Sequence, residues 1–134
     1  MDKERQHIRF DPAVQIVGYF ELINEVTGEF QNHEAFIIKN ISLGGFNLIS
    51  NYPPAIENKY HIFIKYGNEK HEYKVKVIHS RILRFQDQPE GILKPGIVYS
   101  TGCVILDETE LQKDLVLEII KNDCGYPAPE KPTT

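Results

Sequence analysis

The chain has 134 residues, of which 41% are hydrophobic and 25% are charged, values typical of one globular domain with a single core. It contains no apolar stretch of the roughly 18 residues that span a bilayer, no signal-peptide segment and too few cysteines for a disulfide scaffold, so we expect a cytoplasmic protein without membrane insertion. The formal net charge of −4 and the absence of a Lys/Arg-rich run argue against long nucleic acid as a partner, and restrict any bound anion to a small, local one.

The first residues are polar and end in Asp11-Pro12, which predicts an N-terminal arm over residues 1–12. Strands are predicted where apolar and polar residues alternate between clusters of turn residues. They cover residues 14–22, 30–40, 46–50, 60–66, 72–85 and 97–106. The alternation in the fifth strand blurs near Ile78 to Ser80, as a β-bulge would cause. Cys103, in the sixth strand, is expected to face the core as a small apolar residue.

A helix is predicted after the last strand, because Thr109 and Gln112 fit a capping box. An apolar stripe with helical spacing follows, made of Leu111, Leu115, Val116, Ile119 and Ile120. Gly125 and Pro127 end the helix, and the remaining sequence predicts a disordered tail over residues 126–134. The domain at 13–125 is therefore mainly β, with six antiparallel strands that close into a barrel or sandwich and a helix that covers an open end or edge.

Motifs of catalysis and metal binding are absent from the sequence. Ser42 lacks the glycine that a nucleophile elbow needs two residues earlier, since Asn40 stands there. No Lys-Ser or Lys-Thr pair follows the glycines at 44 and 45, so the segment is not a nucleotidase phosphate loop. The histidines show no metal-ligand spacing; they are His7, His33, His61, His71 and His79. We predict neither an enzyme nor a metal site.

Two short motifs flank the first predicted hairpin. Arg5 and Arg9 form Arg-x-x-x-Arg, which alone is commonly a solvated pair of charges. Asn40, Ser42 and Gly45 form Asn-x-Ser-x-x-Gly, which alone is commonly a turn with capped amides and a glycine at positive φ. Residue frequencies give a chance on the order of one in several hundred of finding both motifs in this arrangement. We therefore interpret them as parts of one site.

With these two motifs the sequence resembles the PilZ domain family, bacterial receptors for cyclic di-GMP. The resemblance covers roughly residues 3–122 and implies a six-stranded antiparallel β-barrel with a C-terminal α-helix. It also implies a ligand site for cyclic di-GMP, formed by Arg5, Arg9, Asn40, Ser42 and Gly45, with Gly44, Tyr52 and Gly102 as possible additional contacts. Glu4 stands where many relatives carry a basic or apolar residue, which leaves the ligand stoichiometry open.

The resemblance implies a signalling function without catalysis. Our leading hypothesis is a cyclic di-GMP receptor that regulates motility, biofilm or related bacterial processes in trans. Its partner would be an unidentified protein of motility, secretion or polysaccharide machinery. One alternative is a ligand-independent PilZ-like adaptor. Another is a small barrel that binds single-stranded nucleic acid on aromatic side chains, for which the seven Tyr and seven Phe would provide platforms. The partner, the affinity and the oligomeric state stay open.

Overall fold

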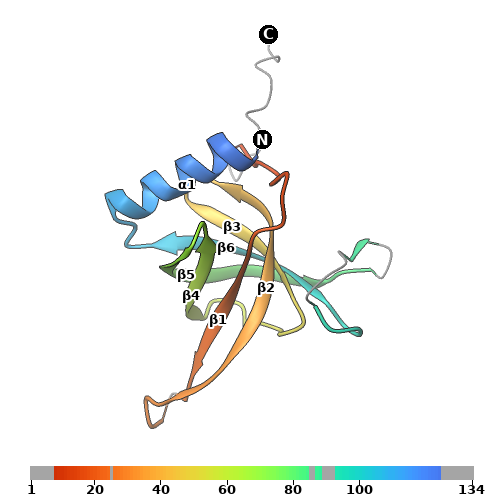
Figure 1. The fold of residues 1–134 in the computed structure, drawn as a ribbon. Helices are drawn as coiled ribbons and strands as arrows, with labels where there is room; N and C mark the ends of the chain where they lie inside the picture. The colour runs from red at the N-terminus through yellow and green to blue at the C-terminus, as the bar shows by residue number, and fades with distance from the viewer. Residues whose placement is uncertain (1–7, 25, 85–86, 89–92, 125–134) are drawn as a thin grey trace, which may run out of the picture.

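The computed structural model describes residues 8–24, 26–84, 87–88 and 93–124. Six antiparallel strands form one closed barrel in the order β1-β2-β3-β6-β5-β4, and a single helix follows (Figure 1). The elements are β1 (Val17–Ile23), β2 (Phe30–Ser42), β3 (Gly45–Ser50), β4 (Lys59–Tyr66), β5 (Glu69–Ile82), β6 (Tyr99–Leu106) and α1 (Glu110–Asp123). The predicted fold is confirmed, and each strand begins within three residues of its expected start.

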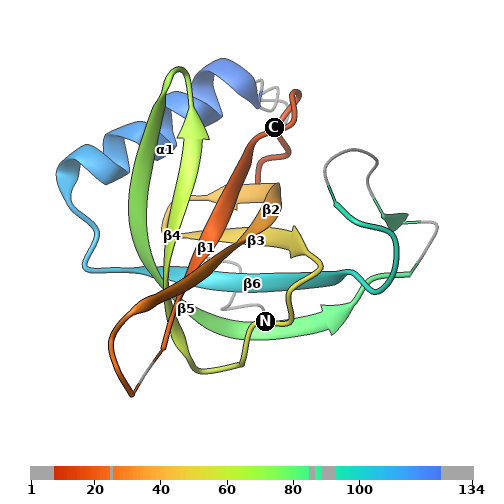
Figure 2. The same cartoon turned by 60° about the horizontal axis from the view of Figure 1, so that its bottom comes forward.

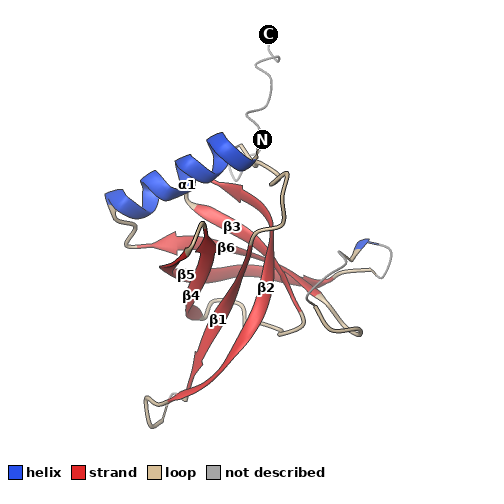
Figure 3. Ribbon diagram, viewed as in Figure 1, coloured by secondary structure: helices blue, strands red, loops and turns tan. Residues whose placement is uncertain are grey.

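The core fills the barrel and continues under the helix, which lies across one end of it (Figure 3). Large side chains from five of the strands meet inside, among them Phe20, Phe36, Leu48, Ile62 and Tyr73, all fully buried. Val116, Ile119 and Ile120 of α1 join the same cluster. The hydroxyl of Tyr73 donates to the carbonyl oxygen of Gln112 at 2.9 Å, so the helix is also held by a hydrogen bond at its first turn.

The capping box at the start of α1 is confirmed: the Thr109 side chain accepts from the Gln112 amide at 3.1 Å, and the Gln112 side chain accepts from the Thr109 amide at 2.9 Å. The predicted apolar stripe is wrong in one member, because Leu111 is 81% exposed. Leu111 lies in the first turn of the helix and is not part of the core cluster. Leu115 is only partly buried at its edge.

Cys103 is buried against the core, as expected, with 3% of its surface exposed. Burial raises the pKa of its thiol to about 12, so the side chain stays neutral and behaves as an apolar group. The predicted tail at 126–134 lies outside the described residues, as do positions 1–7 of the predicted arm. The helix in the described part of the chain is too short and too polar to cross a membrane.

Candidate ligand-binding site

A β-bulge in β2 places the polar residues of the second motif on the outside of the barrel. The pairing of β2 with β3 shifts between Ile38 and Asn40, which makes Lys39 the extra residue. Side chains alternate between the two faces of a strand, so one extra residue exchanges the faces of all that follow. Ile38 is in the core before the bulge, and Ile41, fully buried, is in the core after it. Asn40 and Ser42 therefore point outward and are only partly buried.

A second bulge does the same in β5. Val75 and Val77 are fully buried, and the pairing with β6 then shifts between Val77 and His79, so Ile78 is the extra residue. Without the bulge, His79 would point into the barrel. With it, His79 and Arg81 lie on the outer face and are exposed. The bulge predicted near Ile78 from the blurred alternation is confirmed.

The two bulges bring four residues into one row on the outer face. Asn40 of β2 pairs with Asn47 of β3, which pairs with Gly102 of β6, which pairs with His79 of β5. These four strands lie side by side in the barrel wall (Figure 2). Asn47 also accepts a hydrogen bond from the Ser100 hydroxyl at 2.9 Å. We call these four residues the polar row.

The polar row and the β2–β3 turn line a shallow pocket of about 140 Å³ on the outside of the barrel. Six residues of the predicted site line it: Arg9, Asn40, Ser42, Gly44, Gly45 and Gly102. Asn47, Ile78 and His79 line it as well, and the sequence analysis did not single them out as site residues. None of the described residues that line this pocket is acidic, although the chain as a whole carries a net charge of −4.

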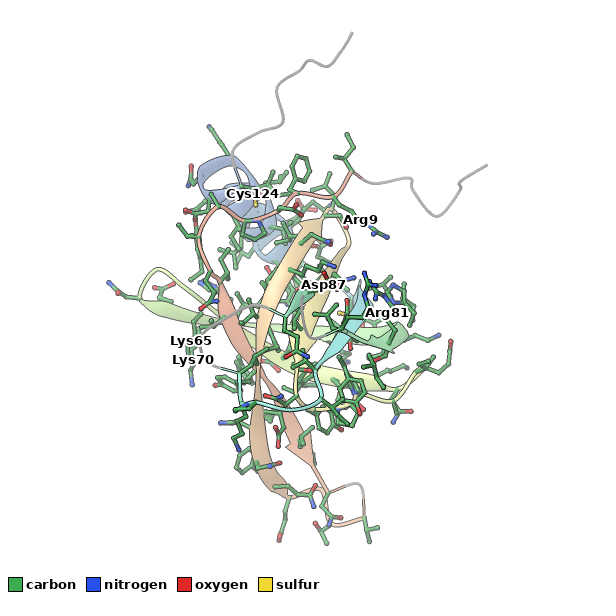
Figure 4. The ribbon with its side chains drawn as sticks, turned by 90° about the vertical axis from the view of Figure 1, so that its right-hand side faces the viewer. Arg9, Lys65, Lys70, Arg81, Asp87 and Cys124 are labelled. Carbon is green, nitrogen blue, oxygen red and sulfur yellow. The ribbon has the colours of Figure 1, made fainter. Side chains whose placement is uncertain are left out.

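Arg9 reaches the pocket because the N-terminal arm pairs with the end of β2. The Phe10 amide donates to the Ile41 carbonyl at 2.8 Å, and the Ile41 amide donates to the Phe10 carbonyl at 2.9 Å. Further along, the Ala13 amide donates to the Asp123 carbonyl at the end of α1. Figure 4 shows Arg9 and Arg81 on the same side of the molecule, the side of the pocket.

The glycines of the β2–β3 turn have different roles. Gly44 has φ of 104°, a left-handed conformation that side chains disfavour. Gly45 packs so closely on β6 that a Cβ atom there would lie 2.5 Å from the Cys103 carbonyl oxygen. The Ser42 hydroxyl donates to the Gly45 carbonyl at 3.4 Å, so it is held beside the turn. A glycine is therefore required at position 44 because φ is positive there, and at position 45 because two backbones approach closely.

The pocket is electropositive and contains a neutral histidine. Partial burial, followed by the charges of Arg9 and Arg81, lowers the pKa of His79 below its usual value. Its imidazole is therefore uncharged at neutral pH and lies near two guanidinium groups. The site thus offers cations, amide and hydroxyl groups, and a flat ring. Among the described residues, no group of three or more His, Cys, Asp or Glu side chains could hold a metal ion.

Two of the predicted contacts are not among the described residues that line this pocket. Arg5, together with Glu4, falls outside the described residues. Tyr52 packs against the core, with its ring centroid 5.5 Å from that of Phe20 and its hydroxyl 3.4 Å from that of Tyr60. Burial and the Tyr60 hydroxyl raise the pKa of Tyr52, as is typical of a tyrosine within a packed cluster.

The fold and the pocket together define a small antiparallel barrel with a polar, cationic site beside its N-terminal arm. Among solved structures the chain is similar to the PilZ domain with c-di-GMP of YcgR from Escherichia coli, with a TM-score of 0.65 and 13% identity over 96% of this chain and 97% of that chain. At this identity the similarity establishes a PilZ-like fold. No protein-family model and no curated protein matches the sequence.

Proposed function

We propose that this chain is a receptor for cyclic di-GMP and that the ligand changes the surface it presents to a protein partner. The observation that carries the proposal is the position of Arg9 beside Asn40 and Ser42 around one pocket whose described lining residues include no acidic side chain. Arg9 is far from Asn40 and Ser42 in the sequence, and the bulge in β2 and a short pairing of the arm with β2 bring them together. The PilZ-like fold, shared with a domain solved with this ligand, supports the same conclusion.

The side chains suit a ligand with two phosphodiester charges and two guanines. The planar guanidinium of Arg9 can bind phosphate oxygens or the O6 and N7 atoms of guanine, and it can stack on a base. Asn40 and Ser42 add donors and acceptors at the edge of the pocket. The bare backbone at Gly44 and Gly45 lets a ligand approach the turn closely.

The free energies of the contacts proposed with the ligand are sufficient for micromolar binding. Charge-assisted hydrogen bonds contribute about 1.5–3 kcal/mol each, and a bidentate guanine contact contributes about 1–3 kcal/mol. A micromolar dissociation constant corresponds to about 8 kcal/mol. Arg5 is four residues from Arg9, so their Cα atoms are at most about 14 Å apart, and a second guanidinium is within reach of the same small ligand. A large basic surface is not required.

The N-terminal arm provides the proposed link between ligand binding and recognition by a partner. Arg5 and Arg9 would hold the ligand from the arm, while Asn40, Ser42 and Gly45 would hold it from the barrel. A bound ligand would then fix the arm against the barrel wall and change the exposed surface there. An unidentified partner in motility, biofilm, secretion or polysaccharide machinery would recognise that surface. The role is one of binding, without catalysis.

The direct test is a calorimetric titration of the pure protein with cyclic di-GMP. We expect saturable binding in the micromolar range, and the molar ratio at saturation will give the stoichiometry that Glu4 leaves open. Cyclic di-AMP, which has the same charge but no guanine O6, should bind more weakly. A titration without heat at high micromolar ligand, from a sample with the circular dichroism of a folded β-protein, would reject the proposal in favour of the ligand-independent adaptor. A gel shift with oligonucleotides at low salt tests the nucleic-acid alternative.

A further inference from the structure

Neither motif accounts for His79, one of the polar side chains that line the pocket. His79 lies at the end of the polar row on β5, faces outward because of the bulge at Ile78, and is exposed to solvent. Its ring covers Gly102, where a Cβ atom would lie 2.2 Å from the His79 Nε2 atom. The missing side chain at Gly102 therefore makes the room that this imidazole occupies.

His79 differs from the other histidines in the described part of the chain. His61 contacts Glu72 at 2.7 Å, and His71 lies 3.8 Å from Glu69. The ring of His33 lies against that of Tyr19 at a centroid distance of 4.1 Å. His79 instead has two cationic neighbours, Arg9 and Arg81, and within the described residues its ring nitrogens have no hydrogen-bond partner.

This environment favours a histidine that contacts a planar, anionic ligand over a histidine with a purely structural role. A neutral imidazole between two guanidinium groups has one donor and one acceptor nitrogen available. Its flat face can lie against a base, and a phosphate that enters the same pocket would bring a negative charge next to the imidazole. β-Bulges often re-aim a side chain beside a functional site, and here the bulge turns His79 from the core to the pocket.

We propose that His79 is a further ligand-contacting residue of this site and that its imidazole lies against the bound cyclic dinucleotide and is protonated there more readily than in the free protein. The proposal rests on the proposed function. It extends the site from the two motifs on the arm and β2 to the opposite strand of the pocket, β5.

The direction of the proton coupling follows from the charges around the ring. Arg9 from the arm and Arg81 from β5 oppose protonation in the free protein. The residues that β2, β3 and β6 contribute around it, Asn40, Asn47 and Gly102, are uncharged. A ligand with two phosphates opposes the effect of the arginines, so binding raises the pKa of His79. Affinity therefore increases as the pH falls from the bound-state pKa to the free-state pKa, and it levels off below that.

The test is a calorimetric titration with cyclic di-GMP at about pH 6, 7 and 8, the range in which histidine titrates. The proteins are the wild type, His79→Ala, His79→Phe and the control His71→Ala, which removes a histidine from the same strand away from the pocket. We expect His79→Ala to weaken binding about tenfold near pH 7 and His79→Phe to weaken it less, since it keeps a flat ring. The wild type and His71→Ala should bind several-fold more tightly at the lower pH, and both His79 variants should lose most of this dependence.

Titrations in buffers with different ionisation enthalpies measure the proton uptake directly, and thermal unfolding verifies that each variant is folded. If the wild type binds while His79→Ala has the same affinity and the same pH dependence, the role of His79 is refuted and the proposed function stands. If the folded wild type does not bind cyclic di-GMP, both proposals are refuted.

Discussion

Two adjacent rows of residues cross the same four strands of the barrel wall and have opposite properties. The polar row, Asn40, Asn47, Gly102 and His79, lies on the outer face and lines the pocket. The next row consists of Ile41, Phe46, Cys103 and Val77, and we call it the core row. All four of its side chains are at least 96% buried.

The difference teaches that residues for stability and residues proposed for binding are separated by one position along β2, β3 and β6, and by two positions across the bulge in β5. The core row removes apolar surface from water, which is the main source of folding free energy. The polar row removes little surface and leaves hydrogen-bonding groups accessible. Substitutions in the core row should therefore change the free energy of unfolding, and substitutions around the polar row should change ligand affinity in a protein that remains folded.

The largest expected effect is that of Ile41→Ala in the core row. Ile41 is fully buried, and removing its larger side chain leaves a cavity in addition to the lost transfer free energy. We expect a loss of about 2–5 kcal/mol in the free energy of unfolding, measured by urea denaturation. Ile41→Val, as a graded control, should lose about 0.5–1.5 kcal/mol. A loss below that of the valine variant would contradict the assignment of Ile41 to the core.

The second effect is on affinity alone and concerns Arg9→Ala. Arg9 is exposed beside the pocket, so its loss removes a charge-assisted contact without leaving a cavity. We expect cyclic di-GMP binding to weaken by about 1.5–3 kcal/mol and the free energy of unfolding to change by less than about 0.5 kcal/mol.

The matched control for Arg9→Ala is Arg84→Ala. Arg84 is also exposed, but it contacts Asp87 at 3.3 Å in the loop after β5, and it does not line the pocket. Its substitution should leave the affinity unchanged. Equal losses in the two variants would indicate a general charge effect and would remove Arg9 from the site.

The core row was largely predictable from the sequence, whereas the polar row was not. Alternation marks Phe46 and Val77 as strand residues and predicts a bulge near Ile78, because these are local patterns. Ile41 lies just beyond the predicted strand at 30–40, and its place in β2 became clear only from the structure. The pairing of Asn47 with Gly102 and of Gly102 with His79 depends on register across three strands that are distant in the chain. No short-range pattern contains that register, so the position of His79 beside Arg9 could not be inferred.

The placement of individual site residues shows the same limit. The short spacing of Asn40, Ser42 and Gly45 indicates a turn, and the resemblance to PilZ domains suggested that Arg9 would lie near it. Tyr52 was proposed as an additional contact from residue type alone, and it packs between Phe20 and Tyr60 instead of lining the pocket. Tertiary packing decides which aromatic side chains are buried in the core, and composition does not determine that packing.

The smallest expected effect is that of Gly102→Ala, which tests the polar row beside His79, where we propose that the ligand lies. The added Cβ would conflict with the His79 ring, the end of a side chain that can rotate away. We expect the fold to persist, with His79 displaced and cyclic di-GMP affinity reduced to the level of His79→Ala, about tenfold below the wild type. The double variant should be no weaker than either single variant, because both substitutions remove the same contact.

Gly45→Ala provides the contrast, since the Cβ added there would meet the backbone carbonyl oxygen of Cys103, which cannot rotate away. We expect this variant to lose about 1–3 kcal/mol of unfolding free energy, the usual effect of forcing atoms into a packed region. The two glycines are both buried and lie on adjacent strands, so the same added methyl group should weaken binding at one position and folding at the other. Additive losses of affinity in the Gly102→Ala/His79→Ala double variant would show that Gly102 acts on the ligand independently of His79.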